Sequence, residues 1–252
     1  MLITISFFIL LLLYMSFPQK RKTLLSKPKN DWILDITGLT IQGTIIPIVQ
    51  TFLLAHLLTK LFPHTAGTLD IWGPFAFVLN FVVVDYIYYW NHRLLHSKIL
   101  WPFHRVHHSV EQFDIIATSR NSVWSSFLIV YVWLNGIAIF MLKDPTYYIL
   151  ALSITAALDL WKHTHIETSS KRLEHFLSKY LFIITPREHA THHNKKARYN
   201  FGANLNIFDK IHKTYSQASD EVWSHLGIKT NLSLTRSLFY PFNPKKRESN
   251  GH

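Results

Sequence analysis

The stretch DYIYYWNHRLLH occupies residues 85–96 and joins an apolar run to a pair of histidines. His92 and His96 are four residues apart, so a helix places both imidazoles on one face. The preceding run, residues 71–91, carries one acid, Asp85, and is long enough to cross about 30 Å of hydrocarbon. An apolar span that leads directly into paired histidines predicts a membrane helix with metal ligands at its end.

Four further apolar runs suggest additional spans, at residues 1–17, 37–59, 121–142 and 145–161, and Asp159 is the one acid among them. Positive residues follow the first run rather than precede it, so we expect an uncleaved anchor with its N-terminus outside. Pro47 predicts a kink in the second run. The sequence therefore predicts an all-α protein, a multi-spanning integral membrane bundle of about four to five helices.

The orientation of this bundle follows from the basic loop at residues 20–29. If this loop is cytoplasmic by the positive-inside rule, the later spans alternate and every histidine-rich segment reaches the cytoplasm as a helical cap. A re-entrant hairpin at residues 37–59 would reverse that orientation. We expect a multi-pass protein of a bacterial inner membrane or the endoplasmic reticulum, with its metal site facing the cytoplasm.

The chain divides into an anchor with a basic loop (1–32), a membrane catalytic domain (33–225) and a C-terminal tail (226–252). We expect the tail to be solvated, because prolines and a charged end follow the last apolar pattern. The chain has 252 residues, 48% of them apolar and 16% charged. This composition fits a membrane domain better than a soluble one.

The chain contains no cysteine, which excludes disulfides, a thiolate zinc site, a cysteine nucleophile and an iron–sulfur cluster. The net charge of +11 could suit a nucleic-acid partner. However, the cations end the apolar stretches, as at residues 20–22, 195–196 and 245–247, where they would face anionic lipid head groups. We therefore expect no nucleic-acid partner.

Nine of the sixteen histidines fall into a few short segments. These are His92, His96, His104, His107, His108, His163, His189, His192 and His193. A single histidine beside a membrane is more often a head-group residue, but three close clusters on one predicted side indicate a metal site. Nine imidazoles exceed what one ion binds, so the count implies two metal ions. The scattered His56, His64, His175, His212, His225 and His252 are expected to be structural or solvated.

The identity of the metal is inferred by excluding a hydrolytic zinc site. Neutral imidazole suits zinc, copper and iron alike. A zinc pair would suit hydrolysis, but no serine, cysteine or glutamate base accompanies these histidines and the pattern His-Glu-x-x-His is absent. Iron with open positions can bind oxygen. The sequence favours two iron ions with O2 as co-substrate, although zinc could occupy the isolated protein.

Acidic residues near the histidines suggest supporting roles. Asp85 lies seven residues before His92, and Asp159, His163 and Glu167 follow at steps of four. We expect these carboxylates to accept histidine N–H groups and so fix the tautomers, the alternative being ordinary polarity at a helix end. Glu167 and His165 compete as a tenth ligand, but a continuing helix would point His165 away from His163.

Together these segments resemble the fatty acid hydroxylase and sterol desaturase superfamily. The similar stretches are DYIYYWNHRLLH, WPFHRVHHS, HTHIE and PREHATHHNKKARYNFGANLNIFDKIHKTY, within residues 75–215. The resemblance implies a helical membrane enzyme with a cytosolic di-iron centre that uses O2. It also implies an external electron donor, either a separate electron-transfer protein or a soluble reductant. HTHIE is further similar to the alkylglycerol monooxygenase branch, which uses a pterin.

The leading hypothesis is an oxidoreductase that hydroxylates or desaturates a C–H bond of a sterol, fatty acyl or alkyl lipid. A pterin-dependent alkylglycerol-type monooxygenase is one alternative. A histidine-rich metal transporter or sensor is another, although transporters usually hold their ligands near the bilayer midplane. The aromatic residues 86 and 88–90 could line the lipid approach or form an interfacial belt.

Overall fold

The computed structural model describes residues 2–165, 171–194, 198–219 and 221–242. Across these residues the chain forms helices and isolated β-bridges but no strand, which confirms the predicted all-α class. The long helices, with segments that continue into one another counted together, are α1 (Leu2–Ser16), α2 (Pro18–Leu25), α3 (Lys29–Thr37), η1 (Gly38–Ile45), α4 (Ile46–Leu61), α5 (Gly73–Val78), η2 (Leu79–Val84), α6 (Asp85–Leu95), α9 (Val130–Met141), α10 (Thr146–Lys162) and α11 (Lys171–Tyr180). The short ones are α7 (Trp101–His104), η3 (His107–Ser109), η4 (Ala117–Ser119), α8 (Ser125–Leu128), α12 (Pro186–His192), α13 (Ile207–Ile211), η5 (Val222–His225) and α14 (Leu234–Phe239).

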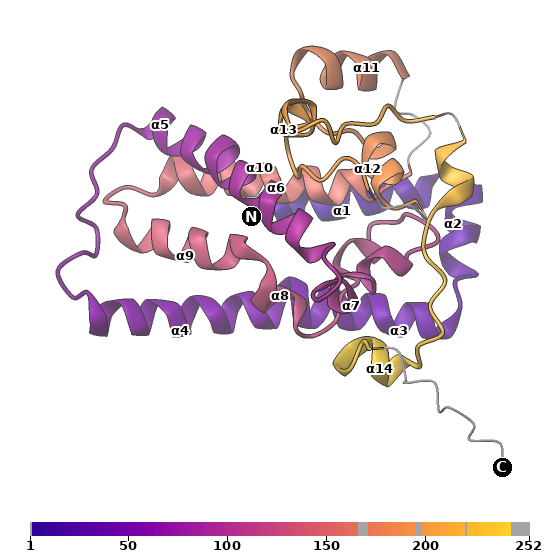
Figure 1. Ribbon diagram of the computed structural model, residues 1–252, viewed down its shortest axis with the longest axis horizontal. Coiled ribbons are helices and arrows are strands. Elements are labelled where there is room, and N and C mark those ends of the chain that lie inside the picture. The colour runs from indigo at the N-terminus through magenta and orange to yellow at the C-terminus, as the bar shows by residue number, and fades with distance from the viewer. Residues whose placement is uncertain (1, 166–170, 195–197, 220, 243–252) are drawn as a thin grey trace.

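Helices α3, η1 and α4 form one continuous helix of 33 residues, Lys29–Leu61, along one side of the molecule (Figure 1). Its mean hydropathy reaches 1.6, and its length of about 50 Å exceeds the hydrocarbon thickness. Among the described residues it alone is long and apolar enough to cross a membrane by these criteria. The segment is unbroken, so residues 37–59 form no re-entrant hairpin. The π-helical η1 precedes Pro47, which lacks the N–H that a regular helix would use there.

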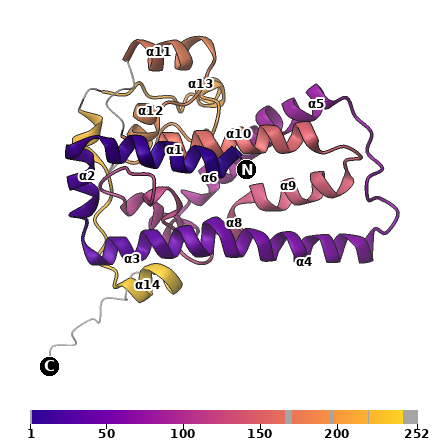
Figure 2. The same cartoon turned by 180° about the vertical axis from the view of Figure 1, so that it is seen from behind.

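A second continuous helix comprises α5, η2 and α6, and His92 lies near its C-terminal end. It packs against α10, and α1 packs along α10 as well (Figures 1 and 2). Buried Ala76, Val84 and Tyr148 fill the space between these helices. The runs predicted at residues 71–91 and 145–161 are therefore helices that lie side by side and support the same end of the molecule.

The run predicted as a span at residues 121–142 is not one continuous helix. The chain breaks between α8 and α9 at Ile129, whose backbone is extended. The side chain of Asn91 bonds both sides of the break. Its amide donates to the Leu128 carbonyl at 3.0 Å, and its oxygen accepts from the Val130 N–H at 3.2 Å. These bonds satisfy the backbone groups that a continuous helix would have paired.

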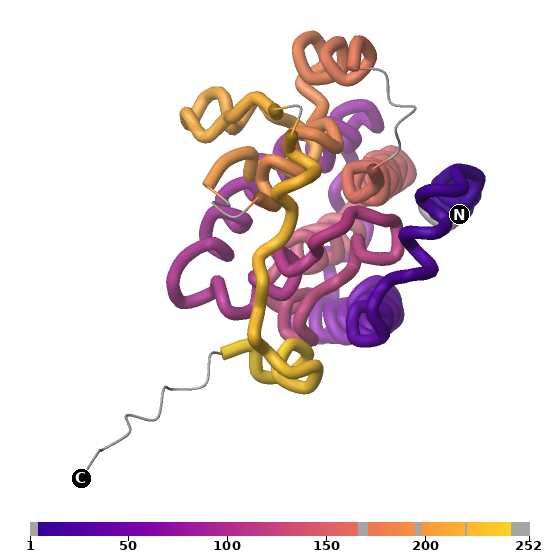
Figure 3. Tube along the Cα trace, turned by 90° about the vertical axis from the view of Figure 1, so that its right-hand side faces the viewer, coloured from indigo at the N-terminus to yellow at the C-terminus, as the bar shows by residue number. Residues whose placement is uncertain are grey.

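The expectation of a solvated tail is wrong for residues 226–242. Helix α14 packs against α3, and its Leu238 is buried. The carbonyl of Leu238 also accepts the N–H of Val123 at 2.9 Å. In Figure 3 this last segment, in yellow, runs down the molecule and ends in helix α14. Residues 243–252 of the predicted tail, with Lys245 and Lys246, lie outside the described residues, as do Lys195 and Lys196.

Candidate metal centre

All nine predicted histidines meet in one place, brought there by four parts of the chain. They come from the end of α6, the α7–η3 segment, the end of α10 and helix α12. Their potential ligand atoms form two groups, each with all atoms within 4.8 Å of one another. The first group is His92, His96, His104, His108 and His192, and the second is His107, His163, His189 and His193.

Close contacts between Nε2 atoms define the centre of each group. In the first group the Nε2 of His104 lies 3.0 Å from that of His92 and 3.2 Å from that of His108. In the second group the Nε2 of His107 lies 3.1 Å from that of His193 and 3.4 Å from that of His163. Nitrogens that converge at this spacing surround a point that one small ion could occupy.

The two groups share a wall because each His-x-x-His-His segment contributes to both. Consecutive residues His107 and His108 belong to different groups, and so do His192 and His193. The rings of His108 and His193 stack across the boundary with centroids 4.4 Å apart. The two groups therefore form one continuous pocket rather than two separate sites.

Four backbone carbonyls fix the orientation of four of these rings. The Nδ1 of His92 lies 2.7 Å from the Phe201 oxygen, and the Nδ1 of His192 lies 2.7 Å from the Tyr199 oxygen. In the second group the Nδ1 of His107 faces the Arg120 oxygen at 3.3 Å. The Nδ1 of His163 faces the Asp159 oxygen at 2.8 Å. A carbonyl only accepts, so Nδ1 carries the proton in each ring and Nε2 presents its lone pair to the centre.

These tautomers make the facing nitrogens suitable for a metal ion. The Nε2 atoms of His107 and His163 face each other as lone pairs, with no proton to share between them. The buried Nε2 of His192 has no hydrogen-bond partner among the described residues. Burial lowers the pKa of His107 and of His192 to about 3, which keeps both rings in the neutral form that binds metal. The donor set thus fits two nitrogen-ligated transition-metal ions.

The predicted role of Asp85 as acceptor of a histidine N–H is wrong, because the Phe201 carbonyl takes that place at His92. Asp85 lies two helical turns away and is fully buried. Its carboxylate accepts the backbone N–H groups of Asn204 at 2.9 Å and Leu205 at 3.0 Å. It also accepts the hydroxyl of Tyr131. Asp85 therefore holds the loop that carries the Phe201 carbonyl, and it acts on His92 only through that carbonyl.

Asp159 acts on His163 mainly through its backbone oxygen, since its carboxylate lies 3.8 Å from Nδ1. That carboxylate lies 3.3 Å from the buried ammonium of Lys162. His165 belongs to neither group and stacks on Trp223 with centroids 3.9 Å apart. Glu167, its rival as a tenth ligand, lies outside the described residues.

The remaining histidines lie away from the centre. His56, His64, His175 and His225 are exposed, His212 contacts the Tyr86 hydroxyl at 3.1 Å, and His252 lies outside the described residues. Among the described histidines, the division between clustered and scattered residues thus follows the one expected from spacing, with His165 outside the cluster.

A buried ionic network supports His107 and was missed from the sequence. Lys27 pairs with Asp35 at 2.6 Å and with Asp114, and Arg120 pairs with Asp35. Arg120 also supplies the carbonyl that orients His107. All four charged side chains are buried. Only Asp114 and Arg120 lie close to a histidine segment in the sequence, and nothing local links them to Lys27 and Asp35.

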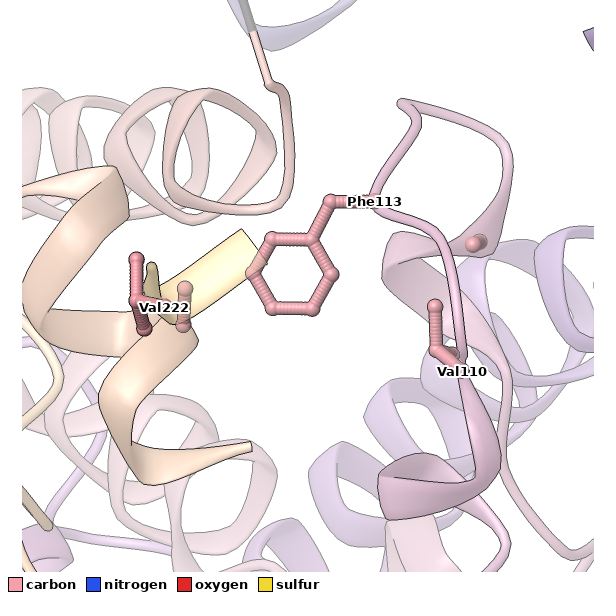
Figure 4. Packing of buried hydrophobic residues seen from close by; sticks show 5 residues of the cluster. Val110, Phe113 and Val222 are labelled. Atoms are coloured by element: carbon pink, nitrogen blue, oxygen red, sulfur yellow. The ribbon is translucent and has the colours of Figure 1, made fainter. Parts of the chain in front are cut away.

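An apolar wall closes the second group of histidines. Phe113 lies between Val110 and Val222 (Figure 4) and belongs to a buried cluster with Ala117 and Ala190. Its ring lies 4.9 Å from that of His193 and 5.4 Å from that of His163. Water is thereby excluded from this side, which strengthens electrostatic interactions in the pocket.

A small cavity with a volume of about 80 Å³ adjoins both groups of histidines. Its wall includes His92 and His104 from the first group, and His107 and His163 from the second. Lys162 also faces it, with its ammonium 2.6 Å from the Ala203 oxygen. The space suits a diatomic molecule or a few waters rather than a lipid chain.

Residues 77–214 match the protein family described as fatty acid hydroxylase. This match covers more than half of the chain, so the chain belongs to that family, and the resemblance inferred from its motifs is confirmed. The apolar helix Lys29–Leu61 and the family together indicate a membrane protein.

Curated relatives carry several lipid-related names. Human alkylglycerol monooxygenase is 30% identical over 155 residues, which cover 60% of this chain and 33% of that protein. Ornithine lipid hydroxylase OlsE of Rhizobium tropici is 31% identical over 188 residues, 71% of this chain and 54% of that protein. Very-long-chain aldehyde decarbonylase GL1-6 of Oryza sativa subsp. indica is 28% identical over 189 residues, which cover 70% of this chain and 29% of that protein. The chain thus spans about a third to about half the length of these relatives, and no solved structure matches it.

Proposed function

We propose that the chain is a membrane-bound, non-haem di-iron oxygenase that hydroxylates or desaturates a lipid C–H bond. The observation that carries the proposal is the pair of buried histidine groups, five and four residues, in a chain of the fatty acid hydroxylase family. His92, His96, His104, His108 and His192 would hold one iron, and His107, His163, His189 and His193 the other. Two iron ions there would supply the oxygen-activating chemistry.

The residues around the pocket would prepare it for that chemistry. Carbonyls of Phe201, Tyr199, Arg120 and Asp159 hold the ring orientations before any ligand arrives. Phe113 excludes water from one side, while Lys162 lines the cavity. The small cavity would admit O2 and only the reacting part of a lipid, so the rest of the substrate would remain outside among apolar side chains.

The relatives support a lipid substrate, since their names include an ornithine lipid, an alkylglycerol and a very-long-chain aldehyde. A sterol, fatty acyl or alkyl lipid therefore remains the proposed class. Electrons would come from a separate protein or a soluble reductant. A pterin-dependent reaction is the second candidate, favoured by the 30% identity with human alkylglycerol monooxygenase.

The proposed placement is a multi-pass protein with the histidine cap in the cytoplasm. Besides Lys29–Leu61, the helix pair formed by Gly73–Leu95 and α10 supports this arrangement, because both lead from an apolar bundle into the metal pocket. A bacterial inner membrane or the endoplasmic reticulum would suit that topology.

The test is a comparison of lipids from cells that express the wild type, His107→Ala, His192→Ala or His64→Ala. His107 and His192 represent the two groups, and the exposed His64 is the matched control. We expect an oxygen-dependent lipid product in the wild type and His64→Ala only. A one-oxygen gain would identify hydroxylation, and a two-hydrogen loss desaturation. Product of wild-type amount in both group variants, or histidine-dependent metal flux without any lipid product, would overturn the proposal.

A further inference from the structure

Asn200 lies between the two backbone carbonyls that orient histidines of the first group. The oxygen of Tyr199, which precedes it, lies 2.7 Å from the Nδ1 of His192. The oxygen of Phe201, which follows it, lies 2.7 Å from the Nδ1 of His92. The two histidines belong to α12 and α6, and the centroids of their rings lie 4.5 Å apart. One turn of three residues therefore holds two rings from helices that are distant in sequence.

The backbone of Asn200 has a left-handed conformation, with φ 57°. Residues other than glycine seldom adopt a positive φ, and asparagine is among the few that tolerate it. The dihedral angles of Asn200 lie between the peptide unit of Tyr199 and that of Phe201, so they help to set the direction of one carbonyl relative to the other. A residue that resists this φ would therefore turn these carbonyls away from their histidines.

The side chain of Asn200 anchors this turn on two sides, and the residue is only 1% exposed. Its amide nitrogen donates to the carbonyl oxygens of Glu188 at 3.0 Å and Ser216 at 2.9 Å. Its amide oxygen accepts the N–H of Ser216 at 2.8 Å. Glu188 lies on α12, one turn before His192. The side chain therefore ties the turn to the same helix whose histidine the turn orients.

The other polar anchors of this loop act on one of the two carbonyls. The carboxylate of Asp209 accepts the N–H of Phe201 at 2.8 Å, and Asp85 binds the same loop further along the chain. Both anchors thus lie on the side of Phe201 and do not contact Tyr199. Asn200 is the residue that the two orienting carbonyls have in common.

We propose that Asn200 is a positioning residue that sets the tautomers of His92 and His192, two of the five histidines of the first group. With their Nδ1 protons directed to the two carbonyls, both rings present Nε2 lone pairs to the centre. The second group takes its orientation elsewhere, from the carbonyls of Arg120 and Asp159. Asn200 would therefore control the affinity of one metal position and not of the other. This effect on metal rests on the proposed function, whereas the tautomers themselves need no metal.

The tautomers are measured in the full chain, purified in detergent without metal and labelled with nitrogen-15 at its histidines. Correlation of ring nitrogens with ring protons separates Nδ1–H from Nε2–H tautomers, and His92→Gln and His192→Gln assign the two signals. Asn200→Ala removes the side chain and disfavours the positive φ. Asn200→Gly removes the side chain but permits that φ, and it keeps the test informative should Asn200→Ala not fold.

Asn206→Ala is the matched control. Asn206 is also an asparagine with 1% exposure, and its amide donates to the carboxylate of Glu188 at 3.2 Å. It is not adjacent to any of the four carbonyls that orient histidine rings. A loss of stability that follows from truncating a buried asparagine is therefore common to both positions, whereas a change of tautomer is expected at Asn200 alone.

We expect His92 and His192 to be Nδ1–H tautomers in the wild type and in Asn206→Ala. Both Asn200 variants should show an Nε2–H signal at these two rings, larger in Asn200→Ala than in Asn200→Gly. His107 and His163 should keep the Nδ1–H form in every variant. Failure of either first-group ring to respond, an equal change at all four rings, or the same change in Asn206→Ala would each overturn the proposal.

Titration of the same chains with zinc against a chromogenic chelator measures the two metal positions, since neutral imidazole binds zinc. We expect two zinc ions per wild-type chain, one of which binds about 10–100-fold more weakly in the Asn200 variants. Equal weakening of both ions would overturn the selective role of Asn200. A wild-type chain with the expected tautomers and zinc affinities but without lipid product would refute the proposed oxygenase and leave the positioning role intact.

Discussion

The backbone N–H of Ile228 lies 2.8 Å from the carbonyl oxygen of His108, and it donates a hydrogen bond there. The preceding residue, Gly227, donates its N–H to the His193 carbonyl at 3.1 Å. One dipeptide therefore ties together the two His-x-x-His-His segments, which are far apart in sequence. Gly227 adopts φ 76°, and a Cβ there would lie 2.7 Å from the Val110 oxygen and 2.8 Å from the Glu111 Cα.

We expect Gly227→Ala to lower metal content and thermal stability together. The left-handed backbone costs alanine about 1 kcal/mol, and the contact with Val110 forces the dipeptide away from His108 and His193. Gly67→Ala is the control, since Gly67 has φ 67° but no atom within 4 Å of an added Cβ. Metal per chain and the unfolding midpoint of the detergent-solubilised protein are the measurements. Equal losses in both variants would show that the dipeptide does not organise the site.

Asp85→Asn should loosen the loop that orients His92. The carboxylate of Asp85 accepts from Asn204, Leu205 and Tyr131, and an amide cannot accept at its nitrogen. One buried donor is left unpaired, at a cost of about 1–3 kcal/mol. We expect a lower unfolding midpoint and reduced metal content. Asp70→Asn removes an exposed carboxylate and serves as control; a midpoint equal to that of this control would contradict the role assigned to Asp85.

Lys27→Met should be strongly destabilising, because it leaves the buried carboxylates of Asp35 and Asp114 without their shared cation. Removing one partner of a buried ion pair costs about 3–5 kcal/mol. Lys143→Met removes an exposed pair with Asp70 at 2.7 Å, and there we expect no detectable change. Chemical denaturation of both variants in the same detergent compares the two pairs. A small effect of Lys27→Met would mean that the network contributes little to holding His107.

The nine histidines could be predicted because their signal is local. His92 and His96 have helical spacing, and the triplets that end in His108 and His193 repeat one pattern, so residue type and separation were sufficient. The groups that orient them carry no such signal. The acceptors at Phe201, Tyr199 and Arg120 are backbone carbonyls, which every residue possesses, and only the tertiary fold selects them.

Two segments show where hydropathy alone is insufficient to predict the structure. Residues 121–142 carry no charge and are long enough for a helical span, yet Asn91, distant in sequence, stabilises a break in the helix at Ile129. Lys27, in the basic stretch at residues 20–29, pairs with Asp35 and Asp114 inside the protein, which its local sequence does not indicate. In both cases a polar side chain from elsewhere in the chain satisfies groups that the local sequence leaves open.

The metal-free protein should lose stability as the pH falls below neutrality. Burial lowers the pKa of His107 and of His192 to about 3, whereas an unfolded chain titrates them near the ordinary value of 6.5. Between these limits the unfolded state binds more protons than the folded state, so the free energy of unfolding rises with pH. Each such histidine contributes a slope of about 1.4 kcal/mol per pH unit, and the slope should vanish above about pH 7.

Denaturation of the chelator-treated protein between pH 8 and pH 5 measures this slope. His192→Gln removes one titrating group and should make the slope shallower, while His64→Ala, which alters an exposed imidazole, should leave it unchanged. Bound metal should oppose the loss at first, because ligation requires neutral imidazole, and then be released as protons compete for the same nitrogens. A stability that does not depend on pH in the metal-free wild type would mean that these histidines are already accessible to protons in the folded chain.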